Sequence, residues 1–199
     1  MLNYKELISL AIKEDIADGD HTTLACIPPS AKGKARLLVK EKGVLAGIEI
    51  AKEVFHQVEK MAVEIGGAQN HRFGLYDMMM IKDNHIDYAG GIKEAIHKCR
   101  TYLDEKNLDL KIEIEARDLN ELEEILAAEK VDRIMLDNYK DLRKAVEMIG
   151  DYAETEASGG INEDTIADYA ACGVDFISVG ALTHQINSLD LSLKAVEDE

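Results

Sequence analysis

Three basic residues lie on either side of one apolar run in the chain. His71 and Arg72 precede the run Met78-Met79-Met80-Ile81, and Lys82 follows it directly. Arginine can hold a carboxylate through two parallel hydrogen bonds, and lysine supplies a compact positive charge. Because the whole chain carries a net charge of -16, this basic group favours a binding site for an acidic substrate. Considered alone, Arg72 fits a surface ion pair equally well, and His71 fits a loop hydrogen bond.

Carboxylates stand at or near the ends of two later apolar runs. Glu115 ends the run 111–115, and Asp137 is the penultimate residue of the run 132–138. If these runs are neighbouring strands, both carboxylates face the same site. There they could hold Mg²⁺, accept hydrogen bonds from sugar hydroxyls or stabilise positive charge in a transition state. Either residue taken alone is more ordinarily a solvated or ion-paired carboxylate.

Glycine-containing groups follow the last two apolar runs. Ser158-Gly159-Gly160 stands before a helical pattern that begins near Ile161, and Gly180 precedes Thr183 and His184. Glycine lets backbone N–H groups approach an anion closely, and a helix N-terminus adds a favourable dipole. A single Ser-Gly-Gly turn is more often only a turn. Two such loops on consecutive late strands favour a phosphate site.

All these residues fall at regular places in an alternation of strand and helix. This alternation predicts an α/β fold made of βαβ units around a parallel sheet, open or closed into a barrel. In βα barrels the functional residues lie at the carboxyl ends of the strands. The predicted strands cover residues 78–81, 111–115, 132–138, 154–160 and 175–180, and the predicted helices cover residues 92–103, 119–128, 142–149 and 161–172.

Residues 1–58 predict a small α+β domain, which precedes the barrel-type domain of residues 59–199. Apolar residues at helical spacing near the N-terminus run into the polar stretch Asp18-Gly19-Asp20-His21-Thr22-Thr23, which predicts a loop. The expected elements of the small domain are a helix over residues 2–15, strands over 35–40 and 44–46, and a helix that continues from 48 to 65.

The bulk composition limits the class of protein. A chain of 199 residues with 46% hydrophobic and 31% charged residues can bury a core and has the composition of a globular protein. Its negative charge and lack of a Lys/Arg run argue against a nucleic-acid partner, and no apolar run approaches membrane-spanning length. Three widely spaced cysteines and a charged N-terminal stretch predict reduced thiols and a cytoplasmic location.

Five ordered motifs resemble those of the quinolinate phosphoribosyltransferase family, also called nicotinate-nucleotide pyrophosphorylase (carboxylating). The resemblance extends over nearly every residue present, including Gly19-Asp20-His21-Thr22-Thr23 and Gly43-Val44-Leu45-Ala46-Gly47 near the start. The five motifs are Asn70-His71-Arg72, Ile81-Lys82-Asp83-Asn84-His85, Leu136-Asp137-Asn138, Glu156-Ala157-Ser158-Gly159-Gly160-Ile161 and Ser178-Val179-Gly180-Ala181-Leu182-Thr183-His184.

The resemblance implies a reaction of NAD biosynthesis. Quinolinate displaces pyrophosphate from phosphoribosyl pyrophosphate (PRPP) and loses a carboxyl group, giving nicotinate mononucleotide and CO₂. Lys82, Glu115 and Asp137 would be catalytic, and the two carboxylates would bind the ribose hydroxyls and Mg²⁺-pyrophosphate. The resemblance also suggests a homodimer or higher homo-oligomer. The remaining implied site residues are His71, Arg72 and Lys82 for quinolinate, and Ser158, Gly159, Gly160, Gly180 and His184 for the 5′-phosphate.

The chain departs from the family pattern near Val58-Glu59. At this point the family has several dozen more residues, which include an arginine-bearing helical segment and a Thr-Arg-Lys-Thr strand that binds both substrates. Their loss would remove the first barrel strand and leave a sheet edge to be covered. We therefore predict a weak or inactive enzyme.

Two other functions remain open from the sequence. One is a related phosphoribosyltransferase-like protein with another base, such as the family member associated with molybdate transport, which shares the strand-end motifs. The other is a non-catalytic remnant that binds a phosphorylated metabolite or pairs with a full-length subunit.

Overall fold

The computed structural model describes residues 6, 9, 10, 13, 14, 16–28, 30, 68–72 and 74–184. The described positions from 6 to 16 are helical, in agreement with the helix predicted near the N-terminus. The predicted strands at 35–40 and 44–46, the predicted helix at 48–65 and the Val58-Glu59 junction lie outside the described residues, so the domain boundary at this junction stays a prediction.

A helix stands where the sequence predicted a polar loop. α2 (His21–Cys26) begins directly after Asp20, whose side chain accepts a hydrogen bond from the backbone N–H of Thr23 at 3.1 Å. The buried hydroxyl of Thr22 accepts a hydrogen bond from the backbone N–H of Met80 at 2.8 Å. The loop prediction was wrong here because the same residue types that form turns also cap helices.

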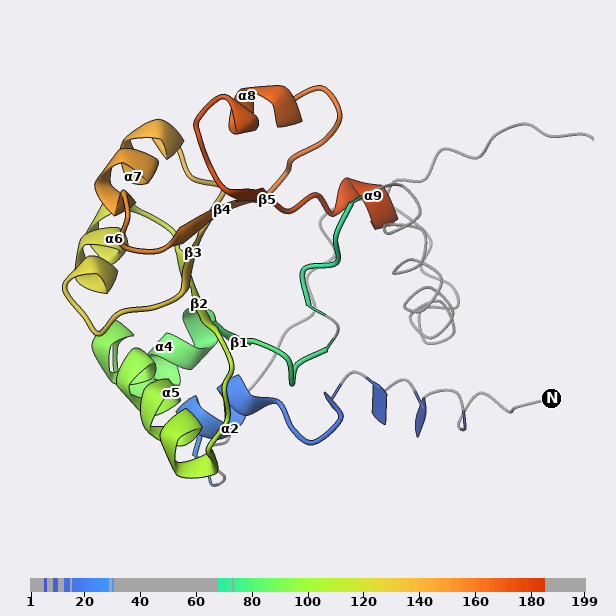
Figure 1. Ribbon diagram of the computed structural model, residues 1–199, viewed down its shortest axis with the longest axis vertical. Coiled ribbons are helices and arrows are strands. Elements are labelled where there is room, and N and C mark those ends of the chain that lie inside the picture. The colour runs from blue at the N-terminus through green and yellow to red at the C-terminus, as the bar shows by residue number, and fades with distance from the viewer. Residues whose placement is uncertain are drawn as a thin grey trace, which may run out of the picture.

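Parallel strands form one curved sheet in the order β1-β2-β3-β4-β5 (Figure 1). The register places Ile81 beside Ile114, Ile114 beside Ile134, and Ala157 beside Ile177. Chain order is therefore the same as spatial order, which confirms the predicted barrel-type parallel sheet. The strands are β1 (Met79–Ile81), β2 (Ile112–Ala116), β3 (Arg133–Asp137), β4 (Glu154–Ser158) and β5 (Phe176–Ile177).

Helices cover the convex face of this sheet, and the concave face is turned towards the N-terminal segment (Figure 1). None of the described helices is long and apolar enough to cross a membrane. The helices after β1 are α4 (Asp83–Ala89) and α5 (Ile92–Lys106), and those after the later strands are α6 (Leu119–Leu126), α7 (Leu142–Ile149), α8 (Ile166–Ala170) and α9 (Ala181–His184).

Two helices differ from the sequence prediction. α4 occupies residues 83–89 directly after β1, where the sequence patterns predicted no helix. α8 begins at Ile166 and not near Ile161, because Asn162 and Thr165 form a turn ahead of it: the Thr165 backbone N–H donates to Asn162 Oδ1 at 3.2 Å. Short polar side chains that bond to the local backbone compete with helix formation in this way.

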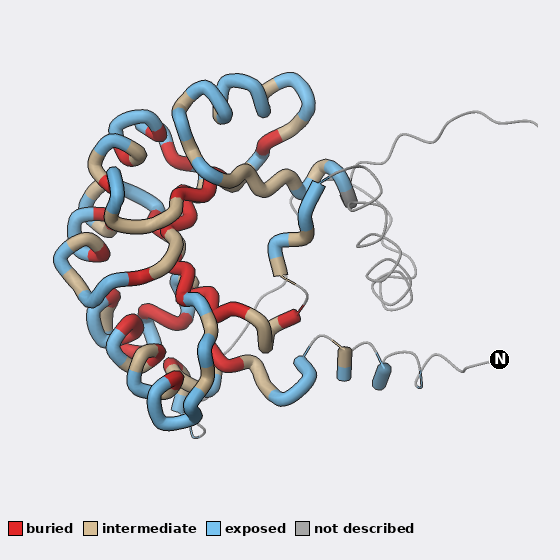
Figure 2. Tube along the Cα trace, in the orientation of Figure 1, coloured by how far each residue is buried: buried red, intermediate tan, exposed pale blue. Residues whose placement is uncertain are grey.

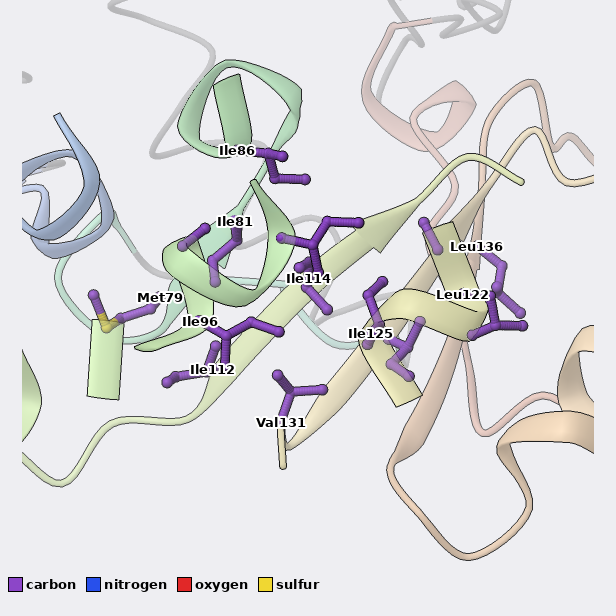
Figure 3. Packing of buried hydrophobic residues seen from close by; sticks show 14 of the residues in the cluster. Met79, Ile81, Ile86, Ile96, Ile112, Ile114, Leu122, Ile125, Val131 and Leu136 are labelled. Carbon is purple, nitrogen blue, oxygen red and sulfur yellow. The ribbon is translucent and has the colours of Figure 1, made fainter. Parts of the chain in front are cut away.

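The core lies between the sheet and the helices, where the buried residues are concentrated (Figure 2). In β2, Ile112, Ile114 and Ala116 are fully buried and belong to this core. Figure 3 shows Ile112 and Ile114 packed with Ile96 of α5 and Ile125 of α6. Since successive strand residues point to opposite faces, the residues between them project from the concave face.

Candidate active site

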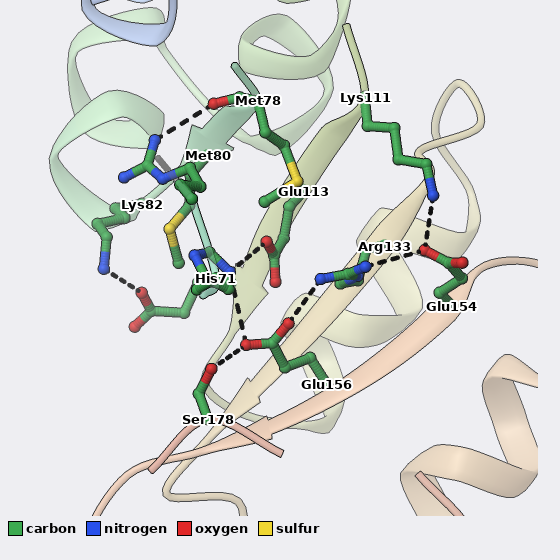
Figure 4. A network of polar contacts seen from close by, with 12 residues as sticks. His71, Met78, Met80, Lys82, Lys111, Glu113, Arg133, Glu154, Glu156 and Ser178 are labelled. Carbon is green, nitrogen blue, oxygen red and sulfur yellow. Dashed lines mark hydrogen bonds and ion pairs between the residues drawn. The ribbon is translucent and has the colours of Figure 1, made fainter. Parts of the chain in front are cut away.

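The carboxyl ends of β1, β2 and β3 bring together three charged side chains predicted to be catalytic. Lys82 directly follows β1, Glu115 lies near the end of β2, and Asp137 ends β3. Each alternates with a buried residue of the core, so each projects from the concave face. Lys82 Nζ lies 3.5 Å from Glu115 Oε2 (Figure 4).

Burial raises the pKa of Glu115 above its ordinary value of 4.5. The positive charge of Lys82 opposes this rise, and the negative charge of Asp137 adds to it. Asp137 is therefore near enough for its charge to act on Glu115. The site therefore combines the cation Lys82 with two carboxyl groups, and the pKa of one of them, Glu115, is raised.

The raised pKa of Glu115 predicts a pH-dependent stability. The folded chain keeps the Glu115 proton to a higher pH than the unfolded chain does, so the contribution of this residue is fully present below pH 4.5 and is lost as the pH rises through the raised pKa. We expect the unfolding free energy of the unmodified chain to fall over this window relative to that of Glu115→Gln. Urea unfolding at a series of pH values from 4.5 to neutral measures the difference.

The exposed Glu124 of α6 provides the control for this prediction. A Glu124→Gln variant should follow the unmodified chain at every pH. A stability difference between the unmodified chain and Glu115→Gln that stays constant with pH, or that changes in the opposite direction, would contradict the prediction.

His85 anchors the turn that places Lys82. The backbone N–H of Lys82 donates to His85 Nδ1 at 3.0 Å, and His85 Nε2 lies 3.4 Å from the hydroxyl of Thr23. Because Nδ1 accepts, the neutral ring carries its proton on Nε2 and donates to Thr23. Burial lowers the pKa of His85, which favours this neutral form. His85 of α4 and Thr23 of α2 thus fix the position of the end of β1.

The glycine pair after β4 adopts a left-handed backbone. Gly159 has φ +94° and Gly160 has φ +65°, values that favour glycine over other residues. No helix starts directly after this pair, because α8 begins only at Ile166. The expectation that a helix N-terminus would help to bind phosphate at this loop was therefore wrong. Gly180 precedes the short helix α9. His184 ends α9, and its side chain lies outside the described part of the chain.

Gly159 is also required for space beside Asp137. A Cβ atom at Gly159 would lie 2.4 Å from the side-chain amide of Asn138, whereas at Gly160 the nearest Asn138 atom would be 3.8 Å away. Asn138 Nδ2 donates to Asp137 Oδ2 at 2.9 Å. The loop after β4 and the Asp137 carboxylate of β3 therefore pack through this one amide.

Gly159→Ala is expected to destabilise the chain by about 1–3 kcal/mol more than Gly160→Ala does. Both variants place an alanine at positive φ, but only the first collides with Asn138 and displaces the amide from Asp137. Urea unfolding of the two variants makes the comparison. Equal losses would show that Asn138 moves aside freely.

The structure does not gather the three predicted basic residues into one group. Arg72 donates from Nη1 to the backbone oxygen of Met78 at 3.2 Å. His71 instead reaches over the concave face, where Nε2 lies 2.9 Å from Glu113 Oε2 and 3.5 Å from Glu156 Oε1. Lys82 pairs with Glu115.

The sequence patterns did not predict a largely buried polar network on the concave face, which lies next to Lys82 and Glu115 (Figure 4). Arg133 of β3 donates to Glu156 Oε2 at 2.9 Å and to Glu154 Oε2 at 3.2 Å. Glu156 also accepts a hydrogen bond from the hydroxyl of Ser178. The available signal was charge inside apolar strands: Glu113 is flanked by Ile112 and Ile114.

A cavity of about 730 Å³ adjoins this network at the β5 edge of the described sheet. Its lining includes His71, Glu156, Phe176, Ser178 and Gly180, so it connects one predicted quinolinate residue with one predicted phosphate residue. A space of this size accommodates a small organic ligand.

Charged side chains at the carboxyl ends of parallel strands are the arrangement found in βα-barrel enzymes. Comparison with known families places this barrel within that class. The sequence pattern described as "Quinolinate phosphoribosyl transferase, C-terminal domain" matches residues 51–194, and the pattern of the N-terminal domain matches residues 20–70. The chain belongs to the quinolinate phosphoribosyl transferase family.

Individual relatives agree with this family. The chain is 46% identical over 153 residues to the chloroplastic nicotinate-nucleotide pyrophosphorylase [carboxylating] of Arabidopsis thaliana, covering 69% of this chain and 44% of that protein. It is 34% identical over 285 residues to the corresponding protein of Oryza sativa subsp. japonica, covering 96% and 77%. The crystal structure of NadC from Streptococcus pyogenes is 39% identical with a TM-score of 0.63, covering 71% and 49%.

The comparisons also bear on the missing segment. The match spans less than half of the Arabidopsis protein (44%) and of the streptococcal structure (49%). The rice alignment runs over 285 positions although this chain has 199 residues, so part of that relative has no counterpart here. The two domain patterns overlap at residues 51–70, which include Val58 and Glu59. These findings agree with the predicted truncation.

Proposed function

We propose that this chain carries the phosphoribosyl-transfer chemistry of its family, in which quinolinate and PRPP yield nicotinate mononucleotide, pyrophosphate and CO₂. The observation that carries the proposal is the convergence of Lys82, Glu115 and Asp137 at the carboxyl ends of three adjacent strands. The names of the relatives supply the substrates, and the geometry of these side chains supplies the chemistry.

The carboxylates act on the ribose of PRPP. As pyrophosphate leaves, the ribose ring gains positive charge, and Glu115 and Asp137 offer negative charge and hydrogen-bond acceptors to it and to its hydroxyls. The partial burial of Glu115 strengthens this interaction, because electrostatic interactions are stronger where water is excluded. The quinolinate nitrogen then bonds to the ribose carbon, and the positive ring nitrogen that results promotes loss of the adjacent carboxyl group as CO₂.

Mg²⁺ fits the same two residues. Glu115 and Asp137 present oxygen donors, which Mg²⁺ prefers, and the charge of Asp137 acts on Glu115. The ion would be held by these residues mainly through the pyrophosphate of the substrate. When bound, Mg²⁺ neutralises charge on the leaving pyrophosphate.

The remaining proposed contacts hold the carboxylates of quinolinate and the 5′-phosphate of PRPP. Lys82 and Arg72 would each contact a carboxylate of quinolinate, and His71, which lies over Glu113 and Glu156, would contact quinolinate from the cavity that it lines. The backbone at Ser158, Gly159, Gly160 and Gly180, with His184, would hold the 5′-phosphate, supported by the left-handed turn at the glycine pair.

We also propose a cytoplasmic location and a homodimer or higher homo-oligomer as the working state. A second copy would cover the β1 edge of the sheet, where the family's first barrel strand has no counterpart in this sequence. Turnover by the 199-residue chain is expected to be slow, because the family's arginine- and lysine-bearing strand has no counterpart in the sequence.

The test begins with the intact mass of the purified protein, which should be 22.1 kDa. Calorimetry with PRPP and with quinolinate, each in the presence of Mg²⁺, is then followed by a radiochemical assay for nicotinate mononucleotide. Binding of both substrates with slow product formation supports the proposal. Binding of PRPP alone would favour a transferase for another base, and binding of inorganic phosphate alone would favour a non-catalytic remnant.

A further inference from the structure

Three side chains on the concave face, none of them among the proposed catalytic residues, converge on one another. They are His71 from the loop before β1, Glu113 from β2 and Glu156 from β4 (Figure 4). One imidazole nitrogen and one carboxylate oxygen from each glutamate lie within 4.8 Å of one another. The shortest separation is 2.9 Å, between His71 Nε2 and Glu113 Oε2.

The strand register explains why the two glutamates meet. Glu113 of β2 pairs with Arg133 of β3, and Glu156 of β4 pairs with Met135 of the same strand. Both glutamates therefore project from the same face on either side of β3. The loop carrying His71 closes over them.

The carboxylates of Glu113 and Glu156 are both buried, and Glu156 has more hydrogen-bond partners than Glu113. Glu113 is 0% exposed and Glu156 is 1% exposed. Glu156 has Arg133 and Ser178 as partners, whereas the described partner of Glu113 is His71 alone. Among the described residues, Glu113 Oε1 is a buried oxygen with no hydrogen-bond partner. A buried carboxylate oxygen without a partner is costly, and a bound cation would satisfy it.

We propose that His71, Glu113 and Glu156 bind a divalent transition-metal ion. One imidazole and two carboxylates form a mixed nitrogen and oxygen set that suits ions such as Zn²⁺ and Mn²⁺. Arg133 and Ser178 bond to Glu156 and fix its orientation, as the outer partners of metal ligands do. His71 and Glu156 also line the cavity of about 730 Å³, so the remaining coordination positions face a space that a ligand can enter.

This site is separate from the proposed Mg²⁺ position. Glu113 lies one side-chain layer further into the sheet than Glu115 on the same face of β2, and Glu156 lies level with Glu115 but two strands away, on β4. A metal ion held by His71, Glu113 and Glu156 would tie the loop bearing His71 to β2 and β4. The proposal goes beyond the proposed function and is tested without either substrate.

The experiment uses Mn²⁺ as the probe and the 199-residue chain. Electron paramagnetic resonance measures free Mn²⁺ during a titration, and pulsed measurements detect a directly bound histidine nitrogen. We expect one tightly bound Mn²⁺ per chain with a nitrogen signal. His71→Ala should abolish that signal, and His71→Ala and Glu113→Gln should each weaken binding by at least the roughly 10–100-fold that loss of an outer partner of a metal ligand costs.

Two controls separate this site from its neighbours. Glu154→Gln alters a glutamate of the same strand as Glu156 but outside the cluster, and it should leave Mn²⁺ binding unchanged. Asp137→Asn alters the proposed Mg²⁺ position and should leave the nitrogen signal unchanged. Absence of binding, absence of the nitrogen signal in the unmodified chain, or loss of binding only in Asp137→Asn would each overturn the proposal. His71 lies on a loop, so His71→Ala remains informative if Glu113→Gln fails to fold.

Discussion

Arg133→Met is expected to reduce the free energy of unfolding by about 3–5 kcal/mol. The Arg133 side chain is 12% exposed and donates to Glu156 at 2.9 Å. Its guanidinium carbon also lies 3.8 Å from the centre of the Phe176 ring, so the residue joins β3 to both β4 and β5. Methionine keeps much of the side-chain volume but removes the charge, leaving the buried carboxylate of Glu156 without its arginine.

Urea unfolding measures this effect, with Arg117→Met as the matched control. Arg117 lies just before α6 and pairs with Glu121 in the first turn of that helix, and half of its side chain is exposed. An exposed pair of this kind contributes at most about 1 kcal/mol. The double variant Arg133→Met/Glu156→Gln should be more stable than Arg133→Met, because it removes the uncompensated charge. A loss in Arg133→Met as small as that in Arg117→Met would show that the network is not a source of stability.

Lys82→Met is expected to lower kcat/KM for the proposed transfer about 100-fold, the usual loss when a charge directed at a transition state is removed. Lys82 places its ammonium group at the end of β1, 3.5 Å from Glu115. The substrates and the leaving pyrophosphate are anions, and the cationic strand of the family has no counterpart in this sequence. Lys82 is therefore a principal positive charge of the remaining site.

Loss of Lys82 should also change the acid side of the pH–rate profile. Lys82 lowers the pKa of Glu115 against the effect of burial. Without this charge the pKa of Glu115 rises further, so a higher pH is needed to ionise it, and the acid limb should move to higher pH.

The control for Lys82→Met is Lys111→Met. Lys111 is also a partly exposed lysine that pairs with a glutamate, Glu154 at 3.1 Å, but it lies at the opposite ends of the strands. Product formation and PRPP affinity should be unchanged in this variant. If both lysine variants lose the same activity, the effect is one of net charge and not of the site.

Local sequence patterns were sufficient for much of the barrel domain. Helix α7 has the predicted bounds, and all five described strands lie within or at most one residue beyond the predicted runs. These strands follow patterns typical of parallel sheets, continuously apolar in β1 and alternating in β2, and neighbouring elements do not override those patterns. The motifs at the strand ends also followed from chain order, since parallel strands end at one edge.

The predictions were wrong where short polar side chains hydrogen-bond to backbone groups. Asp20 and Thr22 have turn-like residue types, but they cap α2 and anchor Met80, respectively. Asn162 and Thr165 delay α8 by forming a turn. In each case the outcome depends on which backbone group a short side chain meets, and spacing alone does not determine that.

Sequence patterns were enough to predict the family, the parallel βα order and the placement of Lys82, Glu115 and Asp137 at one edge of the sheet. The contacts between charged side chains became known only from the tertiary structure. His71 and Arg72 are adjacent in the chain, yet one contacts Glu113 of β2 and the other contacts the backbone of Met78. Arg133, Glu113 and Glu156 form one buried network because strand register sets contacts between residues that are distant in sequence.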